Sequence, residues 1–318
     1  MMGTGAFAEP TFRALLAGKH PVVGLVTNPD RPSGRERELV RGMKQIALGH
    51  AVPVFQPQSI NTPEGVAGLQ AFCPDLLVVA AYGQILSRDV LSVPPHGGIN
   101  VHASLLPRYR GAAPVAWAIY HGETRTGVTI IRMSVHLDAG DMLAQEAIDI
   151  GPDETAGELE ARLAPLGARL ALESIERIAA GTARGVPQDK SQVTKAPKLT
   201  KEHGLIDWAR ACEEVRNHIR AMQPWPSAYT FLHRHGQRPV RLIIYRTRGR
   251  AVSPSGPPHV APGSVLSGES GDLWVATGGN GGIEIVELQP AGKRRMSATD
   301  FLRGHPLQPG DRLGPELP

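Results

Sequence analysis

The stretch INVHASLLPRYRGAAP, residues 99–114, joins the end of an apolar run to a stiff, basic loop. Asn100 and His102 lie two residues apart in the run, and Pro107 with two arginines follows. Side chains two apart on a β-strand point to the same face of a sheet. We therefore expect the amide and the imidazole to project together where this strand ends.

Around this stretch, short β-rich runs alternate with helical patterns through the first 180 residues. Strands are expected at 22–27, 76–81, 98–102 and 128–133, and helices at 10–18, 113–122 and 155–180. The alternation is typical of an α/β, Rossmann-like domain with a mostly parallel sheet, whose carboxyl edge binds ligands. Pro165 falls inside the last helical pattern and is expected to kink or split that helix.

The second half of the chain has a different pattern. Residues 181–204 lack apolar periodicity and carry scattered lysines and prolines, which predicts a linker. Beyond it, a helix at 209–222 precedes short strands at 229–232, 240–245, 273–276 and 283–288, whose spacing suits a small OB-like β-barrel. The expected parts are a catalytic domain over 1–180, the linker, and a second domain over 205–318.

The two halves also differ in charge. Residues 1–180 hold 15 Lys and Arg against 18 Asp and Glu, a net charge of −3. Residues 181–318 hold 19 against 12, a net charge of +7. A basic second half indicates a polyanionic partner such as nucleic acid, although an ordinary solvated basic surface gives the same count.

Several classes of protein are disfavoured by the composition. No apolar run approaches the roughly 18 residues of a membrane span, and no charged-then-apolar leader is present. Cys73 and Cys212 lie far apart without a Cys-x-x-Cys motif, so neither a disulfide framework nor a zinc site is expected. A cytoplasmic location is the expectation.

Asn100 and His102 form a donor pair suited to an oxygen that gains negative charge, and histidine exchanges protons near neutral pH. In HLDAGDM, residues 136–142, Asp138 or Asp141 could orient His102 or hold a water. Gly83 of AYGQIL, residues 81–86, marks a close backbone approach after another strand. The alternative is a strand end whose polar groups cap loop backbone, with an ordinary Asp-Gly turn nearby.

These motifs together carry a resemblance. INVHASLLPRYRGAAP, with AYGQIL before it and LDAGDM after it, resembles the folate-dependent formyltransferases, and most closely the methionyl-tRNA formyltransferase family. The resemblance covers nearly the whole chain. It includes NPDRPSGR (28–35), IDWAR (206–210), RAMQPWPSAY (220–229) and LQPAGKRRMSATDFLRG (288–304).

The resemblance implies transfer of the formyl group of 10-formyltetrahydrofolate to the α-amino group of methionyl-initiator tRNA, for translation initiation. It implies that Asn100 hydrogen-bonds the formyl oxygen, that His102 stabilises the oxyanion, and that Asp138 holds the histidine's protonation state and relays the amine's proton. It also favours a monomer, and nothing in the sequence suggests a metal. The folate would be seated by Ser104, Leu105, Leu106 and Pro107, beside Tyr82 and Gly83.

Basic residues at three places are expected to contact tRNA phosphates. Pro and Gly mark NPDRPSGRERELVRGMK, residues 28–44, as a loop. In the resembling family this is an insertion loop that enters the acceptor-stem end of the tRNA, with Arg35 at the key basic position. After Glu38 this chain has VRGMK instead of a Ser-Pro turn, which leaves acceptor-stem discrimination open. The expected tRNA contacts are Arg31, Arg35, Arg37, Arg41, Lys44, Lys198, Lys201, Lys293, Arg294 and Arg295.

The first residues, MMGTGAFAEP, depart from the family pattern, which has a full β-strand before the Gly-Thr turn. Only Met1 and Met2 stand for that strand, so we expect a truncated first strand and unpaired neighbours, from a late start codon or a shortened chain.

Three other functions are compatible with parts of the sequence. Residues 3–8 fit a Gly-x-Gly-x-x-Ala pattern, which would suit a NAD-dependent oxidoreductase, but the second strand ends in TNPD (27–30), a poor ribose contact. A formyltransferase acting on a sugar nucleotide or purine precursor would keep the same chemistry. A non-catalytic RNA-binding protein would have no use for Asn100, His102 and Asp138 together.

Overall fold

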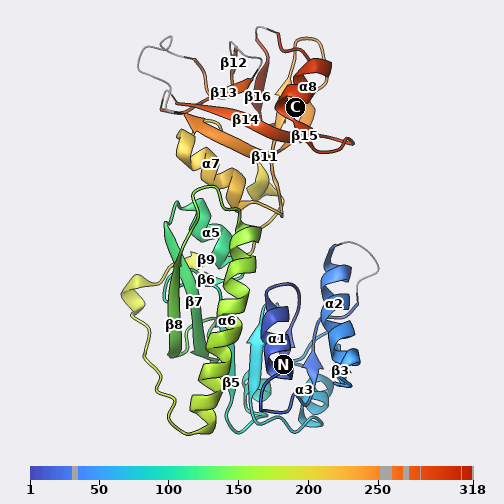
Figure 1. Ribbon diagram of the computed structural model, residues 1–318, viewed down its shortest axis with the longest axis vertical. Helices are drawn as coiled ribbons and strands as arrows, with labels where there is room; N and C mark the ends of the chain where they lie inside the picture. The colour runs from blue at the N-terminus through green and yellow to red at the C-terminus, as the bar shows by residue number, and fades with distance from the viewer. Residues whose placement is uncertain (31–34, 251–259, 268–271, 280, 309, 317–318) are drawn as a thin grey trace. The chain divides into compact units, whose positions relative to one another are not determined.

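The computed structural model describes residues 1–30, 35–250, 260–267, 272–279, 281–308 and 310–316. The chain divides into two compact units, which are described separately (Figure 1). The first unit comprises Met1–Val115, Arg125–Asp149 and Glu158–Lys198, and the second comprises Ala116–Thr124, Ile150–Gly157 and Leu199–Pro318. Each unit is therefore assembled from segments that are separated in the sequence.

The first unit is built on one seven-stranded sheet. The first five strands in its order are parallel, β7 is antiparallel to β5, and β8 is antiparallel to β7. The prediction of a Rossmann-like, mostly parallel sheet is confirmed. The strands in spatial order are β3 (Val54–Phe55), β2 (Leu25–Val26), β1 (Met2–Gly3), β4 (Leu77–Ala80), β5 (Gly98–His102), β7 (Arg125–Arg132) and β8 (Met142–Asp149).

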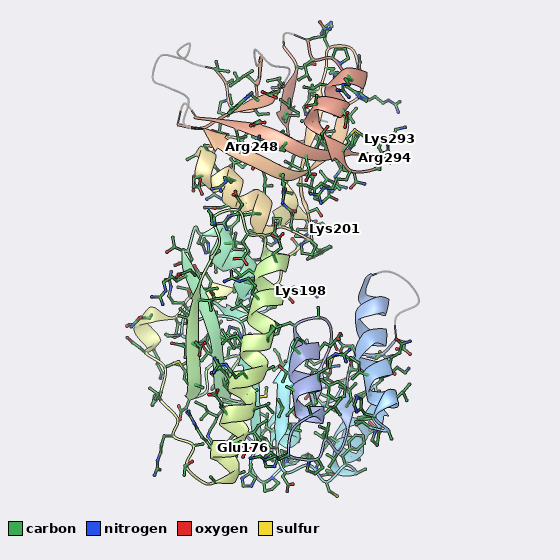
Figure 2. The ribbon with its side chains drawn as sticks, in the orientation of Figure 1. Glu176, Lys198, Lys201, Arg248, Lys293 and Arg294 are labelled. Carbon is green, nitrogen blue, oxygen red and sulfur yellow. The ribbon has the colours of Figure 1, made fainter. Side chains whose placement is uncertain are left out.

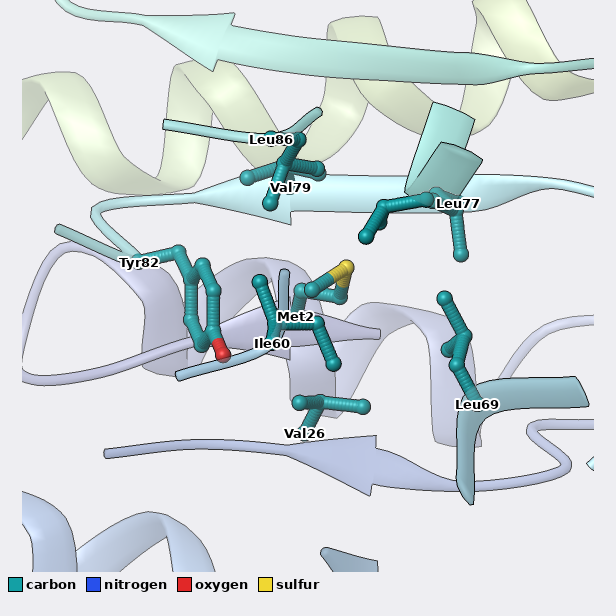
Figure 3. Packing of buried hydrophobic residues seen from close by; sticks show 9 residues of the cluster. Met2, Val26, Ile60, Leu69, Leu77, Val79, Tyr82 and Leu86 are labelled. Atoms are coloured by element: carbon teal, nitrogen blue, oxygen red, sulfur yellow. The ribbon is translucent and has the colours of Figure 1, made fainter. Parts of the chain in front are cut away.

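The short strand β1 lies in the middle of this sheet. Met2 pairs with Val26 on one side and Val79 on the other. The expectation of unpaired neighbouring strands is therefore wrong, because two residues make the pairing and the fully buried Met2 side chain anchors them. Figure 3 shows Met2 in the apolar cluster with Val26, Ile60, Leu69, Leu77, Val79, Tyr82 and Leu86.

Helix α6 (Ala156–Ala179) runs unbroken past Pro165, so the expected split is wrong. Most of α6 belongs to the first unit, where it lies alongside β7 (Figure 1). A Cβ at Gly167 would lie 2.6 Å from Val101 on β5, which shows how closely the helix approaches the sheet. Burial of its apolar face keeps the helix intact despite the lost hydrogen bond. The other helices near this sheet are α1 (Ala8–Leu16), α2 (Arg35–Gly49), α3 (Pro63–Gln70) and α4 (Arg88–Leu91).

Helix α2 corrects the prediction of a loop over residues 28–44. From Arg35 onward the chain is helical to Gly49. Glu, Arg, Leu and Met dominate this segment and favour helix, and Met43 and Ala47 are fully buried. The prolines and glycine that suggested a loop precede the helix, and residues 31–34 lie outside the described residues.

The second unit is an antiparallel sheet with helices α7 (Cys212–Ala221) and α8 (Ala298–Gly304), and it also holds most of α5 (Pro114–Tyr120). Ser264 pairs with Arg312, and Leu313 N donates to Gly263 O at 2.7 Å, which joins the two edges of the sheet. The sheet therefore closes as a small barrel requires. Its strands in order are β12 (Val265–Ser267), β13 (Leu273–Thr277), β14 (Gly281–Pro290), β11 (Val240–Arg250), β10 (Ala228–His233) and β16 (Arg312–Gly314), with β15 (Met296–Ser297) beside β14.

Residues 181–198 belong to the first unit. They contribute β9 (Lys195–Ala196), which pairs in parallel with β6 (Arg110–Gly111) directly after the loop that begins at Ser104. Two short 3-10 turns lie nearby in sequence, Lys190–Gln192 and Glu202–Gly204. Within the described part of the chain, none of the helices has the length and apolar character needed to cross a bilayer.

Candidate functional site

Asn100 and His102 lie on one face of β5, and the loop between β7 and β8 folds back so that Asp138 meets both. Asn100 Nδ2 donates to Asp138 Oδ1 at 3.2 Å, and His102 Nδ1 lies 3.6 Å from Asp138 Oδ2. The side chains of His102 and Asp138 are only 5% and 8% exposed. The structure thus brings together the three residues that the sequence selected as catalytic candidates.

The backbone holds Asp138 in an uncommon conformation. Its φ is +49°, in the left-handed region that few non-glycine residues adopt. Gly111 N donates to Asp138 Oδ2 at 3.0 Å, so a main-chain N–H fixes the carboxylate beside the imidazole. Two residues later, a Cβ on Gly140 would overlap the carbonyl oxygen of Arg132, so this turn requires glycine.

The two ring nitrogens of His102 face different acceptors. Nε2 lies 2.9 Å from the carbonyl oxygen of Tyr109, which can only accept, so Nε2 carries a hydrogen. Nδ1 faces the Asp138 carboxylate. A second proton on the ring would therefore find an acceptor already in place, which suits this histidine to taking up a proton during a reaction.

The loop predicted to bind folate is held to the sheet by the buried Thr129 of β7. Thr129 Oγ1 donates to Ser104 O at 2.6 Å and accepts from Leu106 N at 3.1 Å. Gln145 Nε2 donates to Leu106 O and to Thr129 Oγ1, each at 2.9 Å. Ser104 and Leu106 are thus turned into the fold, whereas Leu105 and Pro107 are half-buried.

In the turn after β4, Tyr82, which was expected beside the folate, is buried, whereas Ile85 is exposed. The Tyr82 ring is buried, burial raises the pKa of its hydroxyl to about 12, and the hydroxyl has no partner among the described residues. Its carbonyl oxygen accepts from Asn28 Nδ2 at 3.2 Å. Gly83 has a φ of +84°, a Cβ there would lie 3.8 Å from Asn28 Nδ2, and Ile85 is 65% exposed. Ile85 was missed, although an apolar residue just after a glycine turn was a usable signal.

The predicted tRNA contacts lie in differing environments. Lys198, Lys201, Lys293 and Arg294 are exposed, the last two at the turn between β14 and β15 (Figure 2). Arg295 pairs with Glu287 and lies 4.4 Å from the Tyr245 ring, and Lys44 pairs with Asp30 at 2.6 Å. Of the rest, Arg35, Arg37 and Arg41 lie on α2, and Arg31 lies outside the described residues.

Three polar side chains at this site were not selected from the sequence: Thr129, Gln145 and Gln188. Each contacts backbone groups of loops, in part together with another side chain, and no periodicity or motif marks such a residue. Gln188 Nε2 donates to Asp138 O and Gly140 O, both at 2.8 Å. It therefore belongs to the structure around Asp138 although it lies 50 residues further along the chain.

Two further features do not coincide with this site. Among the described residues, His, Cys, Asp and Glu side chains form no group of three or more that could hold a metal ion. A cavity of about 320 Å³ is lined by residues preceding β2 and β3, including Lys19, His20 and His50. It lies at the amino ends of parallel strands, whereas α/β folds bind ligands at the carboxyl ends, so we assign it no role in catalysis.

Comparison with known proteins agrees with this geometry. Residues 1–175 match the family model for formyl transferase, and residues 198–306 match that for the formyl transferase C-terminal domain. The methionyl-tRNA formyltransferase of Symbiobacterium thermophilum is 46% identical over 315 residues, covering 99% of this chain and 94% of that protein. The Bacillus subtilis protein of the same name is 42% identical, covering 98% of this chain and 96% of its own length.

Solved structures show the same fold at low identity. WlaRD, a sugar 3N-formyl transferase solved in the presence of dTDP and 5-N-formyl-THF, superposes with a TM-score of 0.64 at 16% identity. The match covers 92% of this chain and 97% of that one. An N-formyltransferase from Helicobacter canadensis, in complex with folinic acid and dTDP-3-aminofucose, gives the same TM-score and identity, covering 89% of this chain and 97% of that one.

Proposed function

The chain belongs to the methionyl-tRNA formyltransferase family, and from that premise we propose that it transfers the formyl group of 10-formyltetrahydrofolate to the α-amino group of methionyl-initiator tRNA, for translation initiation. One observation carries the proposal. The Asn100 amide and the His102 imidazole meet the same carboxylate, that of Asp138, at the end of β5. This arrangement supplies hydrogen-bond donors and a proton carrier side by side, as acyl transfer to an amine requires.

The residues present fit a formyl donor with a flat ring. The exposed Gly83 and Ile85 and the half-buried Leu105 and Pro107 offer an apolar surface at the turn after β4 and the loop after β5. When bound, the folate supplies an electrophilic formyl carbon. We assign Ser104, Leu105, Leu106 and Pro107, with Tyr82 and Gly83, to its binding, Ser104, Leu106 and Tyr82 acting through backbone and packing.

The chain's own side chains then have distinct tasks. Asn100 Nδ2 carries a second hydrogen beyond the one given to Asp138, and we assign that hydrogen to the formyl oxygen as it gains negative charge. His102 Nε2–H, which donates to Tyr109 O in this structure, is the second donor. Preorganised donors of this kind contribute about 3–4 kcal/mol each to lowering a barrier. The ring nitrogen still free to take a proton, His102 Nδ1, faces Asp138 Oδ2, so we assign the Asp138 carboxylate to relay the proton released by the amine and to balance the charge of the ring.

We assign tRNA binding to the basic second half of the chain, residues 205–318, with contributions from the 181–204 segment and α2. Lys198, Lys201, Lys293 and Arg294 are exposed and suited to phosphate contacts. Arg295 already pairs with Glu287 and so contributes less than its neighbours. The names of the curated relatives, all methionyl-tRNA formyltransferases, favour this acceptor over a sugar nucleotide.

One assay separates the alternatives. The purified protein is given radiolabelled 10-formyltetrahydrofolate and, in parallel, methionyl-initiator tRNA, an amino-sugar nucleotide and an amine-bearing purine precursor. We expect label to enter only the tRNA. Faster labelling of either small acceptor would overturn the proposal, and so would failure to label any of the three. We further propose that the enzyme acts as a monomer, which light scattering of the same preparation tests. We also propose that it is located in the cytoplasm.

A further inference from the structure

We infer that Gln188, clamped by Arg110, is a positioning residue that sets the Asp138 carboxylate against Asn100 and His102. The inference rests on the proposed function of those three residues and adds a fourth that the family resemblance did not indicate. Gln188 lies in a stretch whose other residues from 184 to 190 are exposed, and it alone there is half-buried.

The amide of Gln188 can take only one orientation. Its Nε2 donates to Asp138 O and to Gly140 O, both at 2.8 Å. Its Oε1 accepts from Arg110 Nε at 3.0 Å and from Arg110 Nη2 at 2.7 Å. Turning the amide over would set an oxygen against two carbonyl oxygens and an NH₂ group against a guanidinium. All four hydrogen bonds therefore depend on glutamine in this orientation.

The backbone brings Gln188 to this place by docking its segment on the β7–β8 loop. Met142 N donates to Val186 O and Val186 N donates to Met142 O, both at 2.9 Å. One residue earlier, a Cβ on Gly185 would lie 2.7 Å from Asp141 Cβ, so the two segments pack closely. The position of Gln188 is thus set by main-chain pairing before its side chain makes any contact.

The same contacts control both the backbone and the carboxylate of Asp138. Gln188 holds the carbonyl groups on either side of Ala139, within the turn where Asp138 adopts its left-handed φ of +49°. Arg110 fixes Gln188, and the next residue, Gly111, donates its N–H to Asp138 Oδ2 at 3.0 Å. Loss of Gln188 would remove the bonds to both carbonyl groups, and the carboxylate would move relative to Asn100 and His102.

The first test replaces Gln188 by methionine, which keeps length and volume but removes every hydrogen bond. We expect kcat for tRNA formylation to fall by about tenfold or more, because small misplacement of catalytic groups has effects of this size. KM values for both substrates should stay near wild type. Gln192→Ala is the control, since Gln192 lies in the same segment and, in the part of the chain that the structure describes, its Nε2 donates to the nearby Asp189 at 2.8 Å and makes no contact with the Asp138 turn.

Gln188→Glu keeps the test informative if the methionine variant folds poorly. Glutamate retains and strengthens the contact to Arg110 while turning a carboxylate oxygen toward the two carbonyl groups. Because the Arg110 contact is kept, we expect a melting temperature no lower than that of Gln188→Met, and a kcat at least as low as that of Gln188→Met. Full activity of Gln188→Glu would overturn the inference, because the contacts to the Asp138 turn cannot survive this change.

A double-mutant cycle with Asp138→Asn separates positioning from general loosening of the fold. If Gln188 acts through Asp138, adding Gln188→Met to Asp138→Asn lowers kcat little further. If the two effects multiply, Gln188 acts elsewhere and the inference fails. If Asp138→Asn alone retains full kcat, the proposed role of Asp138 fails instead, so the two failures are distinguishable.

Discussion

Replacing Asp138 by asparagine keeps the shape of the side chain and removes its charge and one acceptor oxygen. Oδ1 accepts from Asn100 Nδ2, and Oδ2 accepts from Gly111 N and faces His102 Nδ1. Whichever way the new amide is turned, its NH₂ group faces a hydrogen-bond donor. The variant therefore cannot keep all of these contacts, and it no longer offers a charge to balance a protonated His102.

The size of the effect follows from the bonds that are lost. Interactions with charged groups contribute about 1.5–3 kcal/mol each, so losing one hydrogen bond and the charge that faces His102 costs about 3–6 kcal/mol. If that loss falls on the transition state, kcat drops by about 10²- to 10⁴-fold, since each 1.4 kcal/mol or so of barrier changes the rate about tenfold. We expect the lower part of this range, because Gly111 and Asn100 can partly readjust.

The assay is the initial rate of methionyl-tRNA formylation at saturating substrates, with KM determined for each substrate. We expect kcat to fall and the KM for tRNA to stay near wild type, because Asp138 is nearly buried and lies in the first unit. Asp141→Asn is the matched control, since Asp141 is the exposed acid of the same turn. Wild-type kcat in Asp138→Asn, or an equal loss in Asp141→Asn, would refute the reasoning.

Three further predictions concern binding and stability. Binding of tRNA, measured by filter binding, should weaken steeply as the salt concentration rises. The double variant Lys293→Ala, Arg294→Ala should reduce the magnitude of the slope of log K against log salt by about one unit per side chain, and an unchanged slope would exclude these residues from phosphate contact. Thr129→Val should lower the free energy of unfolding, measured by denaturant titration, by about 2–3 kcal/mol, because the buried loop groups lose their partner. Thr11→Val should be neutral or stabilising in the same titration, because the buried Thr11 hydroxyl has no partner among the described residues. Burial lowers the pKa of His218, so as the pH falls below about 6.5 the unfolded chain binds a proton before the folded one does, and the free energy of unfolding should decrease until the folded pKa is passed. His218→Gln should flatten this part of the profile of stability against pH, and an unaltered profile would show that His218 does not cause the decrease.

The sheet could be predicted where the sequence is strongly patterned. The bounds of β5, Gly98–His102, were predicted correctly, because the apolar Ile99 and Val101 alternate with Asn100 and His102 before the loop begins. β1 was underestimated because its two residues carry no periodicity, and its place depends on pairing with β2 and β4. α2 was missed because the prolines and glycine before it were weighted above the helix-forming residues that follow.

The catalytic candidates could be predicted from the sequence, but the residues that hold them in place could not. The two-residue spacing correctly placed Asn100 and His102 on one face. The glycine turn after β7 offered both Asp138 and Asp141, and the family resemblance selected Asp138. Gln188 and Thr129 could not be found in this way. Each is a single polar residue whose partners, backbone groups and one side chain, are distant in sequence, so its environment exists only once the chain has folded.

The central claim is that an amide and an imidazole jointly stabilise negative charge while a formyl group passes to an aminoacylated RNA. Its most direct test is single-turnover formylation by Asn100→Ala and His102→Ala, with the Kd for methionyl-tRNA measured on the same samples. We predict that each variant slows the chemical step by about 10²- to 10³-fold while the Kd stays unchanged. A chemical step that remains near wild-type speed in both variants would contradict the claim.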